Sequence, residues 1–352
     1  MMYKKIAIVA IISLGAISCN KDAKTNQKTT DSIELKGTEG ETTNLNSTGN
    51  LPEELIAIKE NNGVYTQSFV LAKGQTYPLT TFQRNIQSVT GPDGTKATAT
   101  SNSTDQMSFT VVDFKDGIYN IDINLLGKSS SQSAQGKSVS ISTSGPAPQD
   151  PQLKMMWTMN KALVGNKLQM NMSEKGEVLS VKGFESIYKK IASAAQGEIK
   201  DEKMREQFIG SFKESFSEKT IKEQVSKNLQ ILPTNGAKIG QSWNETENAS
   251  PDGGVKLTTK FTLAKVENGL VNISVTGGIP KKSDKRSQEG MTHTISSELN
   301  QSGTITLDQK TGWVKNQNIS IKTKQSESLS DGKKTQSMQS ETNSTVIVNP
   351  EK

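Results

Sequence analysis

Residues Ser108–Asn124 read SFTVVDFKDGIYNIDIN, and this stretch carries the clearest local signal for a fold. Asp116-Gly117 at its centre is typical of a two-residue hairpin turn, because a type I′ turn needs positive φ at both central residues. After the turn, Tyr119, Ile121 and Ile123 alternate with polar residues, as a half-buried strand requires. The stretch therefore predicts an antiparallel hairpin with one face on an apolar core.

The hairpin pattern occurs a second time. Residues Lys260–Thr276 read KFTLAKVENGLVNISVT, with Asn268-Gly269 in the place of the first turn. A shorter motif precedes each copy, KGQTY at Lys73–Tyr77 and IGQSW at Ile239–Trp243. The repeat predicts two related sheet halves. A third pair of segments aligns with a one-residue gap, Leu168–Val181 with Ile305–Ile321.

The segment between the two copies, Phe184 to Leu229, is of a different kind. Its apolar residues recur at helical spacing, which predicts helices with one buried side. Gly197 and Asp201 indicate a break between a first helix and a longer second one, and Leu232-Pro233 closes the second.

The remaining sequence favours strands with one wet face. Residues 128–150 predict an exposed hairpin or loop, and the chain from about Met291 predicts long antiparallel strands with little apolar content. We expect an α+β fold, mostly antiparallel β, in which two related sheet halves form a curved half-barrel or open sandwich with central helices packed on it. The expected parts of one folded unit, 51–352, are a β-rich half (51–183), a helical segment (184–232) and a second β-rich half (233–352).

The amino terminus carries a different signal. Two lysines precede the apolar run Ile6–Ile17, which has the length of a signal-peptide core and is too short to span a membrane. The single cysteine of the chain, Cys19, follows after Ser18, and the segment resembles a bacterial lipobox with Ala16 in place of the usual Leu. This predicts a signal peptide (1–18), a lipid on Cys19 and a disordered tether (19–50). The alternative is an ordinary secretory signal with a chance cysteine.

Composition excludes several classes of protein. One His and one Cys in 352 residues leave no material for a His-rich metal centre, a zinc ribbon, a Cys–His nucleophile or a disulfide framework. After residue 18 no apolar run reaches the roughly 18 residues that a membrane span needs. A net charge of +6 over this length does not indicate nucleic-acid binding, which needs a concentrated basic patch or stripe.

The order and spacing of short motifs over residues 65–325 resemble an uncharacterised envelope lipoprotein family of Bacteroidota, domain of unknown function family 6263. The motifs are LAKGQTY (71–77), LP (232–233), KIGQSW (238–243) and DQKTGW (308–313). The resemblance implies an envelope lipoprotein with a sheet-rich fold and helices packed on it. It implies no activity and no catalytic residue.

Residues that could carry catalysis are few. His293 fits a surface strand, and Asp113, Asp116 and Asp122 gather on one hairpin, where polar residues are ordinary. A glycoside hydrolase would need two carboxylates about 5–9.5 Å apart in a cleft. We predict no catalytic residue, no metal site and no cofactor.

Aromatic residues are the candidates for a binding site. The phenylalanines Phe208, Phe212 and Phe216 of the helical segment either contact a ligand or partner, or pack on the sheet. Tyr77 and Trp243, at equivalent places of the repeat, either bind a ligand or fill the two ends of one core. The candidate ligand-binding residues are Phe208, Phe212, Phe216, Tyr77, Trp243 and Trp313.

Together these observations predict a membrane-anchored, non-enzymatic envelope lipoprotein that binds an apolar or amphipathic ligand, such as a lipid, between its curved sheet and helices. Its expected partner is the membrane, through the lipid on Cys19, and no nucleic acid. The expected location is the outer membrane, on either face, and the oligomeric state stays open. The alternatives are a structural or adhesive surface module that binds protein or glycan, and a carboxylate-based hydrolase.

Overall fold

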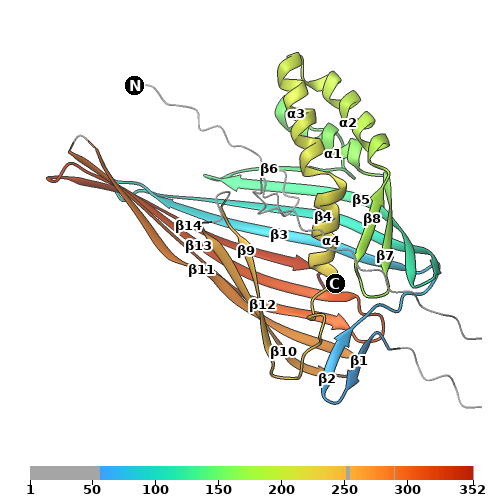
Figure 1. The fold of residues 1–352 in the computed structure, drawn as a ribbon. Coiled ribbons are helices and arrows are strands. Elements are labelled where there is room, and N and C mark those ends of the chain that lie inside the picture. The colour runs from blue at the N-terminus through green and yellow to red at the C-terminus, as the bar shows by residue number, and fades with distance from the viewer. Residues whose placement is uncertain (1–55, 251–253, 289, 352) are drawn as a thin grey trace, which may run out of the picture.

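The computed structural model describes residues 56–250, 254–288 and 290–351. This part of the chain forms one large antiparallel sheet, a two-stranded sheet and four helices (Figure 1). The predicted signal peptide, Cys19 and the tether lie outside the described residues. The strands are β1 (Ile58–Asn61), β2 (Val64–Gln67), β3 (Thr76–Thr90), β4 (Lys96–Lys115), β5 (Ile118–Ala134), β6 (Lys137–Ser142), β7 (Lys167–Ser173), β8 (Val178–Lys182), β9 (Ser242–Asn248), β10 (Lys256–Glu267), β11 (Leu270–Gln288), β12 (Met291–Asp308), β13 (Val314–Ser330) and β14 (Thr335–Val348).

The large sheet has the strand order β8-β7-β5-β4-β3-β14-β13-β12-β11-β10-β9, and β6 pairs with the far part of β5. Strands β9 to β13 repeat the order of β3, β4, β5, β7 and β8, and β14 joins the two sets by pairing with β13 and β3. The two halves therefore stand in tandem in one open sheet. The predicted fold class, mostly antiparallel β with two related halves, is confirmed.

The sequence repeat is also a repeat of backbone geometry. Asp116 and Gly117 have φ of 52° and 75°, and Asn268 and Gly269 have 52° and 72°, as type I′ turns require. A β-bulge interrupts the register after Val111 in the first copy and after Leu263 in the second. The two predicted hairpins therefore form with the same turn and the same bulge.

The helices are α1 (Pro151–Leu163), α2 (Phe184–Glu198), α3 (Glu202–Ser215) and α4 (Glu218–Leu229). Asp201 caps α3 by accepting a hydrogen bond from the Met204 N–H at 2.7 Å, so the predicted break is confirmed. The prediction of one longer second helix is wrong, because Ser217 caps a new helix, α4. Helix α1 was not predicted, although Asp150 caps it and Pro151 begins it.

The sheet curls around α4. At one edge, the Val181 N–H of β8 donates to the Glu218 carboxylate at 3.1 Å. Towards the other edge, Lys227 of α4 pairs with Glu247 of β9 at 2.8 Å. Because a helix of 12 residues is only about 18 Å long, the two sheet edges must approach each other across it. The face that α4 covers is called the concave face below, and the opposite one the outer face.

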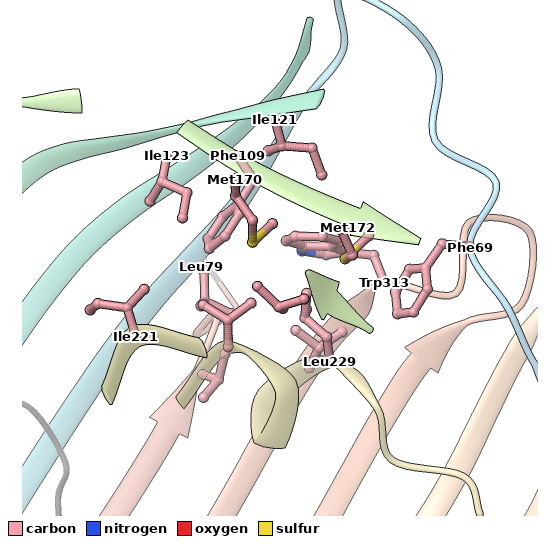
Figure 2. Packing of buried hydrophobic residues seen from close by; sticks show 14 of the residues in the cluster. Phe69, Leu79, Phe109, Ile121, Ile123, Met170, Met172, Ile221, Leu229 and Trp313 are labelled. Carbon is pink, nitrogen blue, oxygen red and sulfur yellow. The ribbon is translucent and has the colours of Figure 1, made fainter. Parts of the chain in front are cut away.

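The apolar core lies between the near part of the concave face and the helices. Side chains from β3, β4, β5, β7 and α4 occupy one space in Figure 2. Leu79, Phe109, Ile123, Met170 and Leu229 belong to it, and none is more than 2% exposed. Side chains fill the space between sheet and helices here.

Beyond this core the strands continue away from the helices and taper to the tips at the far left of Figure 1. No residue in this part of the sheet is fully buried. None of the helices in the described part is long and apolar enough to cross a membrane. The far part of the sheet, called the extension, consists of Gln83–Thr90, Lys96–Asp105, Lys282–Gln288, Met291–Gln301, Lys322–Ser330 and Thr335–Ser344.

Candidate functional site

Two of the predicted binding residues belong to one aromatic group at the core. The Tyr77 and Trp313 rings lie 5.2 Å apart, and Phe109 lies at 5.2 Å from Trp313 on another side. The Trp313 Nε1–H donates to the Pro78 carbonyl at 2.9 Å, and only 4% of this residue is exposed. Trp313 thus acts as a core residue with its polar atom satisfied.

The phenylalanine stripe of the helices is also packed. Phe212 and Phe216 are buried, with ring centroids 5.5 Å apart, and Phe208 is half-buried. Phe184 of α2 contacts Phe216 at 5.7 Å, and the Tyr188 hydroxyl donates to the Phe216 carbonyl at 2.9 Å. The stripe joins α2, α3 and the start of α4. The described residues show no ring contact between this cluster and Tyr77, Trp313 or Trp243.

Trp243 lies apart from both groups, on the edge strand β9. Its ring stacks on Phe261 with centroids 5.6 Å apart. The Trp243 Nε1–H and the Gln224 side-chain amide of α4 are buried donors that have no acceptor among the described residues. Gln224 stands three residues before Lys227, whose ammonium pairs with Glu247 of β9. Two buried donors without acceptors therefore lie on the two elements that meet at this corner.

The same corner perturbs a carboxylate. Glu245 follows Trp243 by two residues on β9, so both point to the same face. Partial desolvation raises the pKa of Glu245, the negative charge of Glu247 raises it further, and Lys227 opposes the shift. The α4–β9 corner, defined as Trp243, Glu245, Glu247, Gln224 and Lys227, thus combines hydrogen-bond donors with ionisable groups.

Apolar side chains continue from this corner along the concave face of the extension. Residues directly opposite in neighbouring strands share a face, so Leu299 lies on the same face as Ile279 of β11 and as the core residue Ile305 of its own strand. Along β12, Ile295 and Met291 follow on that face at intervals of four residues. Leu329 and Met338 on β13 and β14 complete the set.

These side chains are open to solvent to a considerable degree. Ile295 is 46% exposed, Leu329 and Met338 are 43% exposed, and Met291 is 36% exposed. No helix or strand that the structure describes covers them. Polar side chains interrupt the set, since Ser297 and His293 share this face of β12 and Asp284 and Glu327 stand opposite Ile295. Exposed apolar side chains that gather on one face commonly mark a binding surface. We call Ile279, Leu299, Ile295, Met291, Leu329 and Met338 the apolar strip.

The outer face of the same strands carries fewer large apolar side chains, although charged residues such as Asp284, Arg286 and Glu327 also lie on the concave face. The residues of the outer face are mostly hydroxyl, amide and charged, and cross-strand pairs such as Ser296–Ser326 at 2.7 Å and Ser88–Thr98 at 3.2 Å join them. Ile86 of β3 is the large apolar side chain that this face carries in the extension. A hollow of about 450 Å³ opens here between polar and charged side chains.

The candidate catalytic residues do not assemble into a site. Asp113 pairs with Lys73 at 2.9 Å, and this hydrogen-bonded lysine lowers the pKa of its carboxyl. Asp122 pairs with another lysine, Lys167, at 2.8 Å. His293 contacts Glu327 at 2.6 Å on an exposed part of the sheet. Among the described residues no group of three or more His, Cys, Asp or Glu side chains is arranged to hold a metal.

Sequence reasoning identified Trp243 but missed the rest of the corner and the apolar strip. The signal for the strip was present, since Met291, Ile295 and Leu299 recur every four residues in a strand, which places them on one face. The corner had no local signal, because β9 and α4 meet only through the curl of the sheet.

The fold and its surfaces define a sheet-rich protein with helices on one face and two chemically different faces beyond them. The sequence model of a family of unknown function (DUF6263) matches residues 116–314. The chain therefore belongs to this family.

Comparison with solved structures gives only distant similarities. Lipovitellin, solved for its lipid–protein interactions, matches with a TM-score of 0.36 and 10% identity, over 79% of this chain and 25% of that one. The OccK7 protein of Pseudomonas aeruginosa matches with a TM-score of 0.17 and 8% identity, over 78% of this chain and 98% of that one. An outer membrane channel of Pseudomonas putida F1 matches with a TM-score of 0.16 and 8% identity, over 83% of this chain and 99% of that one. No curated protein matches, and at these TM-scores no function is transferred.

Proposed function

We propose that this protein is a non-enzymatic, lipid-anchored protein of the bacterial cell envelope that binds an amphipathic ligand on the concave face of its sheet, beside α4. The observation that carries the proposal is the one-sidedness of the extension. Its partly exposed large apolar side chains lie on the concave face, apart from Ile86, whereas the outer face is polar.

The proposed ligand lies farther from the helices than the sequence suggests. Phe109, Met170 and Leu229 fill the space under α4, so an apolar ligand there would have to displace the core (Figure 2). The apolar strip begins where this core ends. A ligand chain that covers the strip would bury apolar area at about 25 cal/mol per Å².

The α4–β9 corner supplies the polar half of the site. The Trp243 and Gln224 donors would bind ligand oxygen atoms, because a buried donor without an acceptor costs free energy that a ligand acceptor recovers. The Lys227–Glu247 pair stands beside them. A molecule with an apolar chain and an oxygen-rich head matches this arrangement.

Native mass spectrometry of the full chain purified from its own host tests the proposal, with cis-parinaric acid fluorescence as a titration. We expect a co-purified lipid. The double substitution Ile295→Ser and Leu299→Ser should raise the dissociation constant for cis-parinaric acid about tenfold, equivalent to about 1.4 kcal/mol.

The matched control is Ile86→Ser, which removes an apolar side chain from the same part of the sheet but on the outer face. It should leave the dissociation constant unchanged. A preparation without lipid that also fails to bind cis-parinaric acid would refute the proposed site. So would equal weakening by the control and by the double substitution.

The anchor has its own test. Cys19→Ala should abolish incorporation of radiolabelled palmitate and release the protein from membranes, because a protein without its acyl chains loses the apolar area that holds it there. Continued labelling of the variant would contradict lipidation at Cys19. Protease treatment of intact cells would then show whether the outer membrane protein faces the medium.

A further inference from the structure

The outer face of the extension carries a hollow that the amphipathic-ligand proposal does not use. It has a volume of about 450 Å³ and opens over β12, β13, β14 and β3, near the start of β4. This volume lies within the range of about 300–1,000 Å³ that is usual for ligand sites. We call it the outer hollow. Its charged lining residues are Lys96, Lys281, Glu298, Lys324 and Glu341.

Some of these charges already have partners. Lys324 pairs with Glu298 at 3.3 Å, and Lys322, just outside the hollow, pairs with Glu341 at 2.9 Å. The hydrogen bond from Lys322 lowers the pKa of Glu341, so this carboxylate is ionised at neutral pH. Cross-strand pairing of this kind stabilises a sheet and needs no ligand to explain it.

Lys96 and Lys281 differ from that pattern. Both line the hollow, and neither forms an ion pair within the described part of the chain. Lys281 lies in the bulge of β11 between Ile279 and Lys282, where two residues stand opposite the single residue Glu298, and Lys96 begins β4 opposite Thr90. Three lysines thus line the hollow against two glutamates, which leaves an excess of positive charge for an anion.

Both lysines stand where their strands lack a neighbour on one side. Pairing of β4 with β5 begins at Ala99, after Lys96, and pairing of β11 with β10 ends at Gly278, before Lys281. Edge strands often carry lysine to prevent pairing with other chains. The two lysines are therefore placed to protect exposed strand edges, and they also line the hollow.

The other side chains of the lining are hydroxyls and amides. Ser88, Thr90, Ser296, Ser326 and Gln339 contribute donors and acceptors, and no aromatic or large aliphatic residue lines the hollow. Such a lining forms hydrogen bonds with a hydroxyl-rich ligand and offers little to an apolar one. We propose that the outer hollow binds an acidic saccharide, with its carboxylate groups at Lys96 and Lys281 and its hydroxyl groups at the Ser, Thr and Gln side chains.

Isothermal titration calorimetry on the full chain tests this assignment. The probes are hyaluronan tetrasaccharide, which carries two carboxylates, the neutral, fully N-acetylated chitotetraose (called chitotetraose below), and free glucuronate. We expect binding of the acidic tetrasaccharide that weakens as salt rises, and at least tenfold weaker binding of chitotetraose and of glucuronate.

Substitutions locate the site. Lys96→Ala combined with Lys281→Ala should weaken tetrasaccharide binding about tenfold, whereas Lys333→Ala, in the exposed β13–β14 turn, should leave it unchanged. Glu341→Gln should strengthen binding about threefold, since it removes a negative charge and releases Lys322. Weaker binding from the lysine substitutions together with stronger binding from Glu341→Gln cannot both come from misfolding.

Several outcomes would overturn the proposal. These are no binding of the acidic tetrasaccharide, binding that the Lys96/Lys281 double variant leaves unchanged, and equally tight binding of chitotetraose. The amphipathic-ligand proposal does not depend on any of these results, because its substitutions and its probe belong to the concave face.

Discussion

The near and far parts of the same strands follow different chemistry. In β12, Ile305 and Leu307 are buried under the helices, whereas Met291–Gln301 of the same strand contains no buried residue. Antiparallel backbone pairing continues through both parts, with a register shift between Thr306 and Leu307 in the near part. The difference shows that hydrogen-bonded pairing extends this sheet well beyond the region where burial of apolar surface stabilises it.

The two parts should therefore contribute unequally to stability. Burial of a large apolar side chain contributes about 1.5–3 kcal/mol, whereas a cross-strand pair contributes roughly 0.2–1 kcal/mol. The near part holds the buried cluster, and the extension holds mostly cross-strand pairs. Substitutions matched between the two parts can test this division.

The largest difference is expected between Phe109→Ala and Ile295→Ala. Phe109 is 1% exposed and contacts Trp313, so its loss should lower the free energy of unfolding by about 3–5 kcal/mol. Ile295 is 46% exposed, and its loss should cost less than about 1 kcal/mol. Urea unfolding measures both. Equal losses would show that the extension is part of the stabilising core.

The second contrast compares two glycines in turns at opposite ends of β13. Gly312 has φ of 76°, and a Cβ there would stand 2.1 Å from the Ser68 carbonyl oxygen. Gly332 has φ of 83° and open space around it. Gly312→Ala should cost more than about 2 kcal/mol, and Gly332→Ala about 1 kcal/mol, in thermal or urea unfolding. A larger loss at Gly332 would argue against tight packing at the near end.

A third substitution tests a polar contact in the core. The buried Tyr119 hydroxyl donates to the Phe69 carbonyl at 3.0 Å and accepts from the Leu71 N–H at 3.2 Å. Tyr119→Phe leaves both backbone groups without this partner and should cost about 1–2 kcal/mol. Tyr77→Phe is the control, because the Tyr77 hydroxyl accepts only one hydrogen bond, from an exposed N–H. This substitution should lower the free energy of unfolding by less. Unfolding curves recorded in one urea series would show whether the order holds.

The smallest effects are expected in the pH dependence of stability. Glu341 of the extension has a lowered pKa, so its contribution is present above its ordinary pKa and is lost as pH falls through the lowered one. Glu245 at the α4–β9 corner has a raised pKa, so stability falls as pH rises from its ordinary pKa through the raised one. At pH 7, Glu341→Gln should therefore destabilise and Glu245→Gln should stabilise.

Urea unfolding from pH 3 to pH 8 measures both variants against the unsubstituted chain. The Glu341→Gln difference should vanish below the lowered pKa, and the Glu245→Gln difference should vanish near pH 4 and below. If the two substitutions change stability at pH 7 in the same direction, the assigned shifts do not have opposite signs.

Local signals in the sequence account for a large part of the fold. Asp116-Gly117 and Asn268-Gly269 specify the two hairpins because few residue pairs adopt positive φ twice. The cap at Asp201 is a similar signal. The missed elements had signals of the same kind, Asp150-Pro151 for α1 and Ser217 for α4, which a polar surrounding sequence obscured.

The long-range features could not be predicted in this way. Strand β14 pairs with β3, for example Val348 with Thr81, and no local pattern links residues so far apart in the chain. This pairing joins the two halves into one sheet. The α4–β9 corner depends on the resulting curl, so the candidate site could be predicted only as the single residue Trp243.

The alternation of side chains between two unlike faces also limits how the extension can change in evolution. An insertion of one residue into β12 would move every residue beyond it to the opposite face, so that Ile295 would exchange places with the polar row of Ser296 and Glu298. A single extra residue is accommodated at a β-bulge, as between Ile279 and Lys282 of β11. Without a bulge, the length of the extension can change only by pairs of residues, inserted together in strands that share a hairpin. Relatives of this chain whose extension differs by an odd number of residues should therefore carry a bulge at the insertion.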